Sequence, residues 1–118
     1  MIYGSIYGEN KDRPLLMRVM RTTHPFERIQ GLLGRPALGA GEGLLIIPCN
    51  SIHTAFMSCP IDLLFLGRDW TIRKMVHALR PWRMACSLNA SMVLELMPDT
   101  LGSLDLNIGM KLYWEEQR

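Results

Sequence analysis

Residues 48–66 read PCNSIHTAFMSCPIDLLFL, and this stretch decides the fold. It ends with an apolar run, residues 61–66, which contains one acidic residue, Asp62. Pro60 precedes this run and Gly67 follows it. A short apolar run between turn-forming residues is typical of a β-strand. His53, Thr54 and Asp62 lie within or beside this run, so polar chemistry and core-forming residues meet in one place.

The pattern continues on both sides of this stretch. Short apolar or alternating runs separated by Gly and Pro predict strands at 15–21, 44–47, 52–57, 61–66, 70–79, 91–97 and 111–114. Pro25 and Glu27 suit the first turn of a helix, and Gly34 suits its C-terminal cap. We therefore expect a mostly β fold, a compact β-sandwich or barrel of about six to eight short strands with one short helix near residues 25–33.

Length and composition indicate one domain. The chain has 118 residues, of which 48% are hydrophobic and 20% charged, a balance typical of a globular domain with its own core. Residues 1–14 are polar, contain glycine and end in proline, and we interpret them as an N-terminal lead-in. Residues 15–118 are expected to form a single β-rich domain.

Charge and cysteine content limit the cellular setting. Every apolar run is shorter than the roughly 18–20 residues of a membrane span, and the first residues lack the pattern of a secretory signal. With three cysteines, too few for a disulfide scaffold, we expect a cytoplasmic protein.

Charge is unevenly spread along the chain. Residues 1–83 carry 11 Lys and Arg against 6 Asp and Glu, whereas residues 84–118 carry 2 against 5. The basic part suits an anionic partner.

Several motifs, in order, resemble the domain-of-unknown-function family 192. They are ERIQGLLGR (27–35), GEGLL (41–45), HTAFMSCPIDLLF (53–65), VLEL (93–96) and Gly109. The resemblance runs from about residue 22 to residue 112 and implies a small β-sandwich or barrel with a short helix. It implies no reaction, because the family has no established role. Many relatives look secreted and carry a Phe-Trp-Met-Lys-Asn-Thr run. This chain resembles a His-Thr variant without a signal peptide, which Pro81-Trp82-Arg83 accompanies.

Asp62 is the first candidate site residue. Both of its sequence neighbours are apolar, so we expect its carboxylate to be at least partly buried and to need a partner. That partner is one of the arginines Arg28, Arg35 and Arg83, or a set of backbone N–H groups at the entry of the strand. The alternative is a carboxylate that binds a ligand or acts as a catalytic acid.

His53 and the cysteines carry an alternative, enzymatic hypothesis. Cys49 or Cys59 paired with His53 would form the nucleophile of a small hydrolase or transferase. The order Cys49-x3-His53-x5-Cys59 also suggests zinc, with Cys86 or His77 as a fourth ligand. It lacks the close cysteine pair typical of zinc sites, so we expect no metal.

The leading hypothesis is a non-enzymatic binding or accessory module. Its expected site, at the edge of the sandwich, is formed by Arg28, Arg35, His53, Thr54, Asp62, Trp82 and Arg83. Tryptophan and arginine are common anchors of protein interfaces. We expect a protein partner or a small anionic ligand. The chain has no phosphate-binding glycine motif and no basic and aromatic pattern of a nucleic-acid reader, so we expect neither a cofactor nor nucleic acid.

Overall fold

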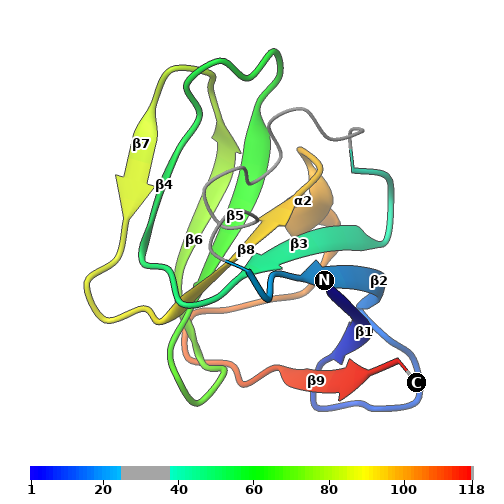
Figure 1. Ribbon diagram of the computed structural model, residues 1–118. Helices are drawn as coiled ribbons and strands as arrows, with labels where there is room; N and C mark the ends of the chain where they lie inside the picture. Colours follow the sequence, from blue (N-terminus) through cyan, green and yellow to red (C-terminus); the bar gives the residue numbers. More distant parts are fainter. Residues whose placement is uncertain (25–37, 118) are drawn as a thin grey trace.

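The computed structural model describes residues 1–24 and 38–117, and in them the expected mostly β fold is confirmed (Figure 1). The helix expected at 25–33 lies outside the described residues. The elements are β1 (Ile2–Tyr7), β2 (Leu16–Arg21), β3 (Glu42–Ile46), β4 (Ser51–His53), β5 (Ile61–Leu66), β6 (Ile72–Leu79), β7 (Met84–Cys86), β8 (Met92–Leu96), α2 (Thr100–Ser103) and β9 (Tyr113–Glu116).

Seven strands form one mixed sheet in the order β6-β5-β8-β3-β2-β1-β9, in which only β2 and β3 are parallel neighbours. β4 and β7 form a separate antiparallel ribbon. Among the described residues, the sheet is not closed into a barrel, because its end strands β6 and β9 do not pair with each other. An isolated bridge from Thr71 to Lys111 and a few backbone hydrogen bonds join only the chain around the start of β6 to the chain before β9. The barrel alternative is therefore wrong. The chain forms a turn from Asn107 to Met110, and β9 begins only after it, at Tyr113.

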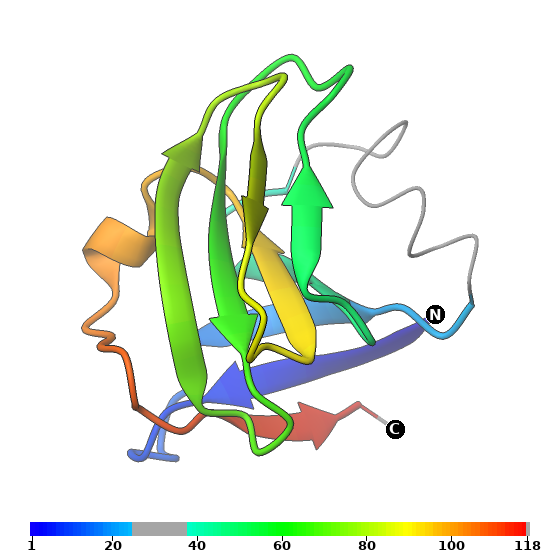
Figure 2. The ribbon, with the colours of Figure 1, turned by 90° about the vertical axis from the view of Figure 1, so that its left-hand side faces the viewer.

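The sheet is covered on both faces, which explains why every residue of β5 and β8 is buried. Alternate residues of β5 enter different cores, since successive side chains of a strand point to opposite faces. Leu64 and Leu66 join the core on the side of α2, together with Leu101. Leu63 and Phe65 join the core on the side of β4, together with Ile52 and other residues. Figure 2 shows α2 and β4 on opposite sides of β5 and β6.

Two strands, β1 and β7, lie outside the seven ranges predicted from the sequence. Residues 2–7 of the expected N-terminal lead-in form β1, which pairs with both β2 and β9 and buries Ile6 completely. The strand was not expected from the sequence, although Ile2, Gly4 and Ile6 alternate with polar or aromatic residues. β7 has 3 residues and pairs only with β4, so its short sequence carried no strand pattern of its own.

Candidate functional site

Asp62 lies on the α2 face of the sheet and is 1% exposed. Its Oδ1 accepts a hydrogen bond from the N–H of Ala78 at 2.8 Å, and its Oδ2 accepts one from the N–H of Leu101 at 2.9 Å. The sequence left two kinds of partner open for this carboxylate, an arginine or backbone N–H groups. The structure shows backbone N–H groups.

The two donors explain why an acidic residue stands in this strand. Between the pairs Ile61 with Leu79 and Leu63 with Val76, β6 holds two residues opposite Asp62, which is a β-bulge. Ala78, at φ 49°, belongs to that bulge, and its N–H bonds to the carboxylate. The N–H of Leu101 lies in the first turn of α2, which lacks a side-chain cap of its own. Asp62 thus satisfies two donors that secondary structure leaves over, the buried N–H of Leu101 and the part-buried N–H of Ala78.

Thr54 directly follows β4 and joins two loops. It is fully buried, and its Oγ1 donates to the carbonyl of Arg80 at 2.5 Å and accepts from the N–H of Arg83 at 2.9 Å. Its backbone N–H bonds to the carbonyl of Arg83, and its carbonyl accepts the N–H of Trp82. These bonds fix residues 80–83 against residues 54–57.

Phe56 and Trp82 project from these two loops and form what we name the aromatic tip. Their ring centroids are 4.6 Å apart in an edge-to-face arrangement, yet the side chains remain 74% and 61% exposed. Both residues have a left-handed backbone, with φ of 66° and 63°. Such a conformation costs a bulky residue roughly 1–3 kcal/mol and is enriched at functional sites. The bonds of Thr54 hold it in place.

His53 and Met84 flank the aromatic tip on the outer face of the β4–β7 ribbon. They are cross-strand partners, and both side chains are exposed, whereas Ile52 between the ribbon and the sheet is buried. Sequence reasoning missed Phe56 and Met84. The available signal for Phe56 was a large apolar residue in a segment otherwise rich in turn formers.

The charge around the aromatic tip is one-sided. Residues 43–61 and 70–94 contain no Asp or Glu, and two of their basic residues, Arg80 and Arg83, flank Trp82 in the chain. Arg80 and Arg83 are exposed, and Arg83 bonds to the carbonyl of Trp82 at 3.3 Å. An acidic group can therefore approach the tip without meeting a like charge.

The structure brings together only part of the expected site. His53, Thr54, Trp82 and Arg83 converge at the aromatic tip, whereas Asp62 faces α2 across the sheet. Arg28 and Arg35 lie outside the described residues.

The described contacts do not assemble a cysteine nucleophile. The Cys49 thiol donates to the carbonyl of Ser51 at 3.1 Å, and Cys59 is exposed. In the part of the chain that the structure describes, His53 makes no hydrogen bond to either thiol, and no three His, Cys, Asp or Glu side chains group as metal ligands would. Nor does any helix there reach the length and apolarity needed to cross a membrane.

Comparisons with known proteins agree with this fold. Residues 8–114 match the model of the DUF192 family, described as Uncharacterized ACR, which confirms the resemblance seen in the sequence. No curated protein matches the chain. A crystal structure from Sinorhizobium meliloti 1021, provisionally described as a transcription regulator, is 23% identical with a TM-score of 0.79, over 96% of this chain and 92% of that one. A protein of unknown function from Novosphingobium aromaticivorans DSM 12444 is 21% identical with a TM-score of 0.72, over 95% and 84%.

Proposed function

We propose that this chain, which belongs to the DUF192 family, is a binding module that captures an acidic polypeptide segment at its aromatic tip. The observation that supports this most strongly is the exposed Phe56–Trp82 pair, held on two left-handed loop positions by the buried Thr54. An aromatic pair kept in solvent at a cost in backbone energy is poorly explained by folding alone.

The shape and charge of the tip argue for a polypeptide. Small-molecule sites are concave, whereas these rings project from loops and need a partner that supplies its own pocket. Tryptophan and arginine are the residues that most often anchor protein interfaces, and Arg80 and Arg83 stand beside Trp82. The absence of acidic residues from both flanking segments favours a partner that carries Asp or Glu around an apolar pocket.

The test begins with a photo-crosslinking amino acid at Met84, a residue that is 73% exposed beside the tip. The partner identified in this way is purified, and its affinity is measured for wild type, Trp82→Gly and Leu88→Ala. Glycine accepts the left-handed backbone, so this substitution removes the side chain without straining the loop. Leu88 is 90% exposed and serves as the matched apolar control.

We expect Trp82→Gly to weaken binding by about 30-fold, the effect of an interface hot spot of about 2 kcal/mol, and Leu88→Ala to leave it unchanged. Arg83→Gln should weaken binding at low salt and lose its effect at high salt, since exposed charges are screened. Unchanged affinity of a folded Trp82→Gly protein would overturn the proposal.

The cytoplasm is the compartment we propose for this role, because the three cysteines form no disulfide. The alternative, a hydrolase or transferase that uses His53 with Cys49 or Cys59, predicts a reactive thiol. Its labelling rate would change with pH, and His53→Ala would shift that profile. Thiols that label at the rate of a model peptide would exclude this alternative.

A further inference from the structure

A second surface lies at the opposite end of the β5–β6 hairpin. β5 has 6 residues and so separates its two ends by about 17–20 Å. The aromatic tip is near its start, and the turn Gly67–Trp70 follows its end, at the lower edge of the molecule in Figure 1. Beside this turn, a cleft of about 840 Å³ opens between residues 47–50, residues 90–92 and the beginning of β9.

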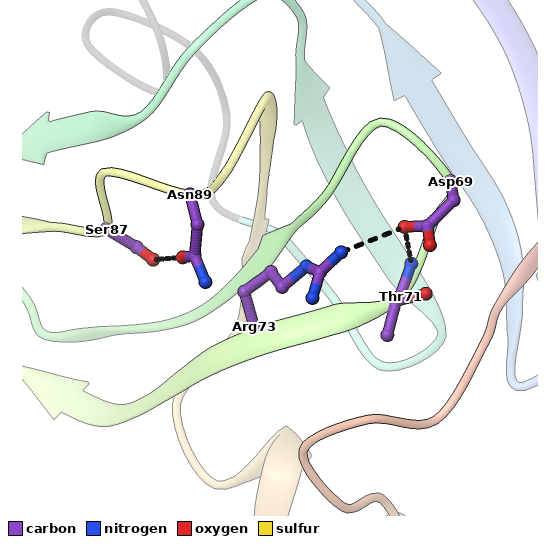
Figure 3. A network of polar contacts seen from close by, with 5 residues as sticks. All are labelled: Asp69, Thr71, Arg73, Ser87 and Asn89. Carbon is purple, nitrogen blue, oxygen red and sulfur yellow. Dashed lines mark hydrogen bonds and ion pairs between the residues drawn. The ribbon is translucent and has the colours of Figure 1, made fainter.

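The cleft is positively charged. Three cations line it, Arg21, Arg68 and Lys111, and no Asp or Glu does. Across the described residues, none of these three takes part in an ion pair. The acid of the adjoining turn, Asp69, is already engaged, since it accepts the N–H of Thr71 at 3.2 Å and lies 3.6 Å from the guanidinium of Arg73 (Figure 3). Three cations thus share one cleft without an internal counter-charge.

Aromatic rings form one wall of the same cleft. Trp70 and Trp114 stack with centroids 6.2 Å apart and an interplanar angle of 17°, and Tyr113 lies beside them. A backbone hydrogen bond ties the wall to the chain before β9, since the carbonyl of Trp70 accepts the N–H of Leu112 at 2.9 Å. Trp114 in turn packs directly over Gly4, where an added Cβ would lie 2.6 Å from the indole ring.

We propose that this cleft binds a small organic dianion attached to a planar ring. Guanidinium groups match the oxygens of phosphate and carboxylate, and aromatic side chains suit a flat ring. The volume lies within the range of roughly 300–1,000 Å³ typical of small-molecule sites and exceeds what inorganic phosphate alone would fill. An aryl phosphate and an aryl dicarboxylate share this chemistry, and the experiment distinguishes them.

Tryptophan fluorescence provides the readout. The chain has three tryptophans, and in Trp82→Phe the remaining two both line the cleft. This variant is titrated with phenyl phosphate, phthalate, inorganic phosphate and phenol. We expect saturable quenching by phenyl phosphate or phthalate. Phosphate, which lacks the ring, and phenol, which lacks the dianionic group, should bind at least about tenfold more weakly. The tighter of the two aryl dianions identifies the charged group.

Charge variants complete the test. Arg68→Gln and Lys111→Gln should each weaken binding about tenfold, the value of one charge-assisted contact, and the affinity should fall further as salt is raised. Arg13→Gln, an exposed arginine outside the cleft, is the matched control. Arg68 and Lys111 are exposed, so both variants should fold. The absence of saturable quenching by both aryl dianions, or binding that the Arg68→Gln, Lys111→Gln double variant retains in full, would overturn the proposal.

Discussion

Asp62→Asn tests whether one buried carboxylate joins β6 and α2 to the sheet. Aspartate presents two acceptor oxygens to the N–H groups of Ala78 and Leu101, whereas asparagine presents one oxygen and one NH₂ donor. The substitution keeps the size of the side chain. It therefore leaves one backbone N–H, the buried one of Leu101 or the part-buried one of Ala78, facing another donor.

The expected loss follows from that geometry. A buried donor without an acceptor costs about 1–3 kcal/mol, and the facing NH₂ group adds repulsion, so we expect Asp62→Asn to lower the free energy of unfolding by about 2–3 kcal/mol. Asp62→Ala, which leaves both donors unsatisfied, should cost about 2–6 kcal/mol. For a chain of 118 residues, 1 kcal/mol corresponds to about 3–5 °C in Tm, so the Asn variant should melt about 6–15 °C lower.

Urea unfolding followed by circular dichroism measures this loss, with Asp105→Asn as a control at an exposed aspartate. Amide hydrogen exchange locates it, since the N–H of Ala78 or Leu101 should exchange faster in the variant. An Asp62→Asn protein within about 0.5 kcal/mol of wild type, the usual range of surface substitutions, would refute the reasoning.

Two further predictions concern the walls of the cleft. Gly4→Ala should lower the free energy of unfolding, measured in urea, by about 1–3 kcal/mol, because its Cβ would lie 2.5 Å from the carbonyl oxygen of Glu115. Gly102→Ala is the control: no atom lies within 4 Å of its Cβ, so it should be neutral or slightly stabilising. Equal effects of the two substitutions would contradict this. Hydrogen bonds from the hydroxyl and then the N–H of Thr71 lower the pKa of Asp69 below its ordinary value of 3.8. The support this carboxylate gives the turn is therefore present above pH 3.8 and lost as pH falls through the lower folded pKa, which an NMR titration of the Asp69 carboxyl checks; titration at or above 3.8 would contradict it.

The buried strands were predictable because their sequence carries its own pattern. β5 lies exactly where its apolar run predicted, and β2, β3 and β8 lie within one or two residues of their predicted ends. β1 and β7 were missed for different reasons. The alternation in β1 is weak, because it includes a glycine and two tyrosines, and one of its two partners, β9, lies at the far end of the chain. β7 exists only as the partner of β4. A three-residue strand has no periodicity for sequence reasoning to detect.

The same distinction applies to the candidate site. That Asp62 is buried followed from its neighbours, but its partners did not, because the bulge that frees the N–H of Ala78 arises from the register between two strands. The approach of Thr54 to Arg83 likewise rests on bonds between segments 29 residues apart. Trp82 was named from the sequence as a candidate anchor of an interface, whereas its ring contact with Phe56 required the fold.

The aromatic tip and the aromatic wall of the cleft lie next to different cores, and this makes the two proposed surfaces separable. Ile52, next to the loops of the aromatic tip, belongs to the core on the β4 side, whereas Trp70 and Trp114 of the cleft pack against the core on the α2 side. Substitutions at sites more than about 7–10 Å apart without shared partners usually act independently. Trp82→Gly should therefore leave binding of an aryl dianion unchanged, and Arg68→Gln should leave capture of the polypeptide unchanged. If either substitution altered both, the β5–β6 hairpin between them would have to transmit the change, and the sites would be one functional unit.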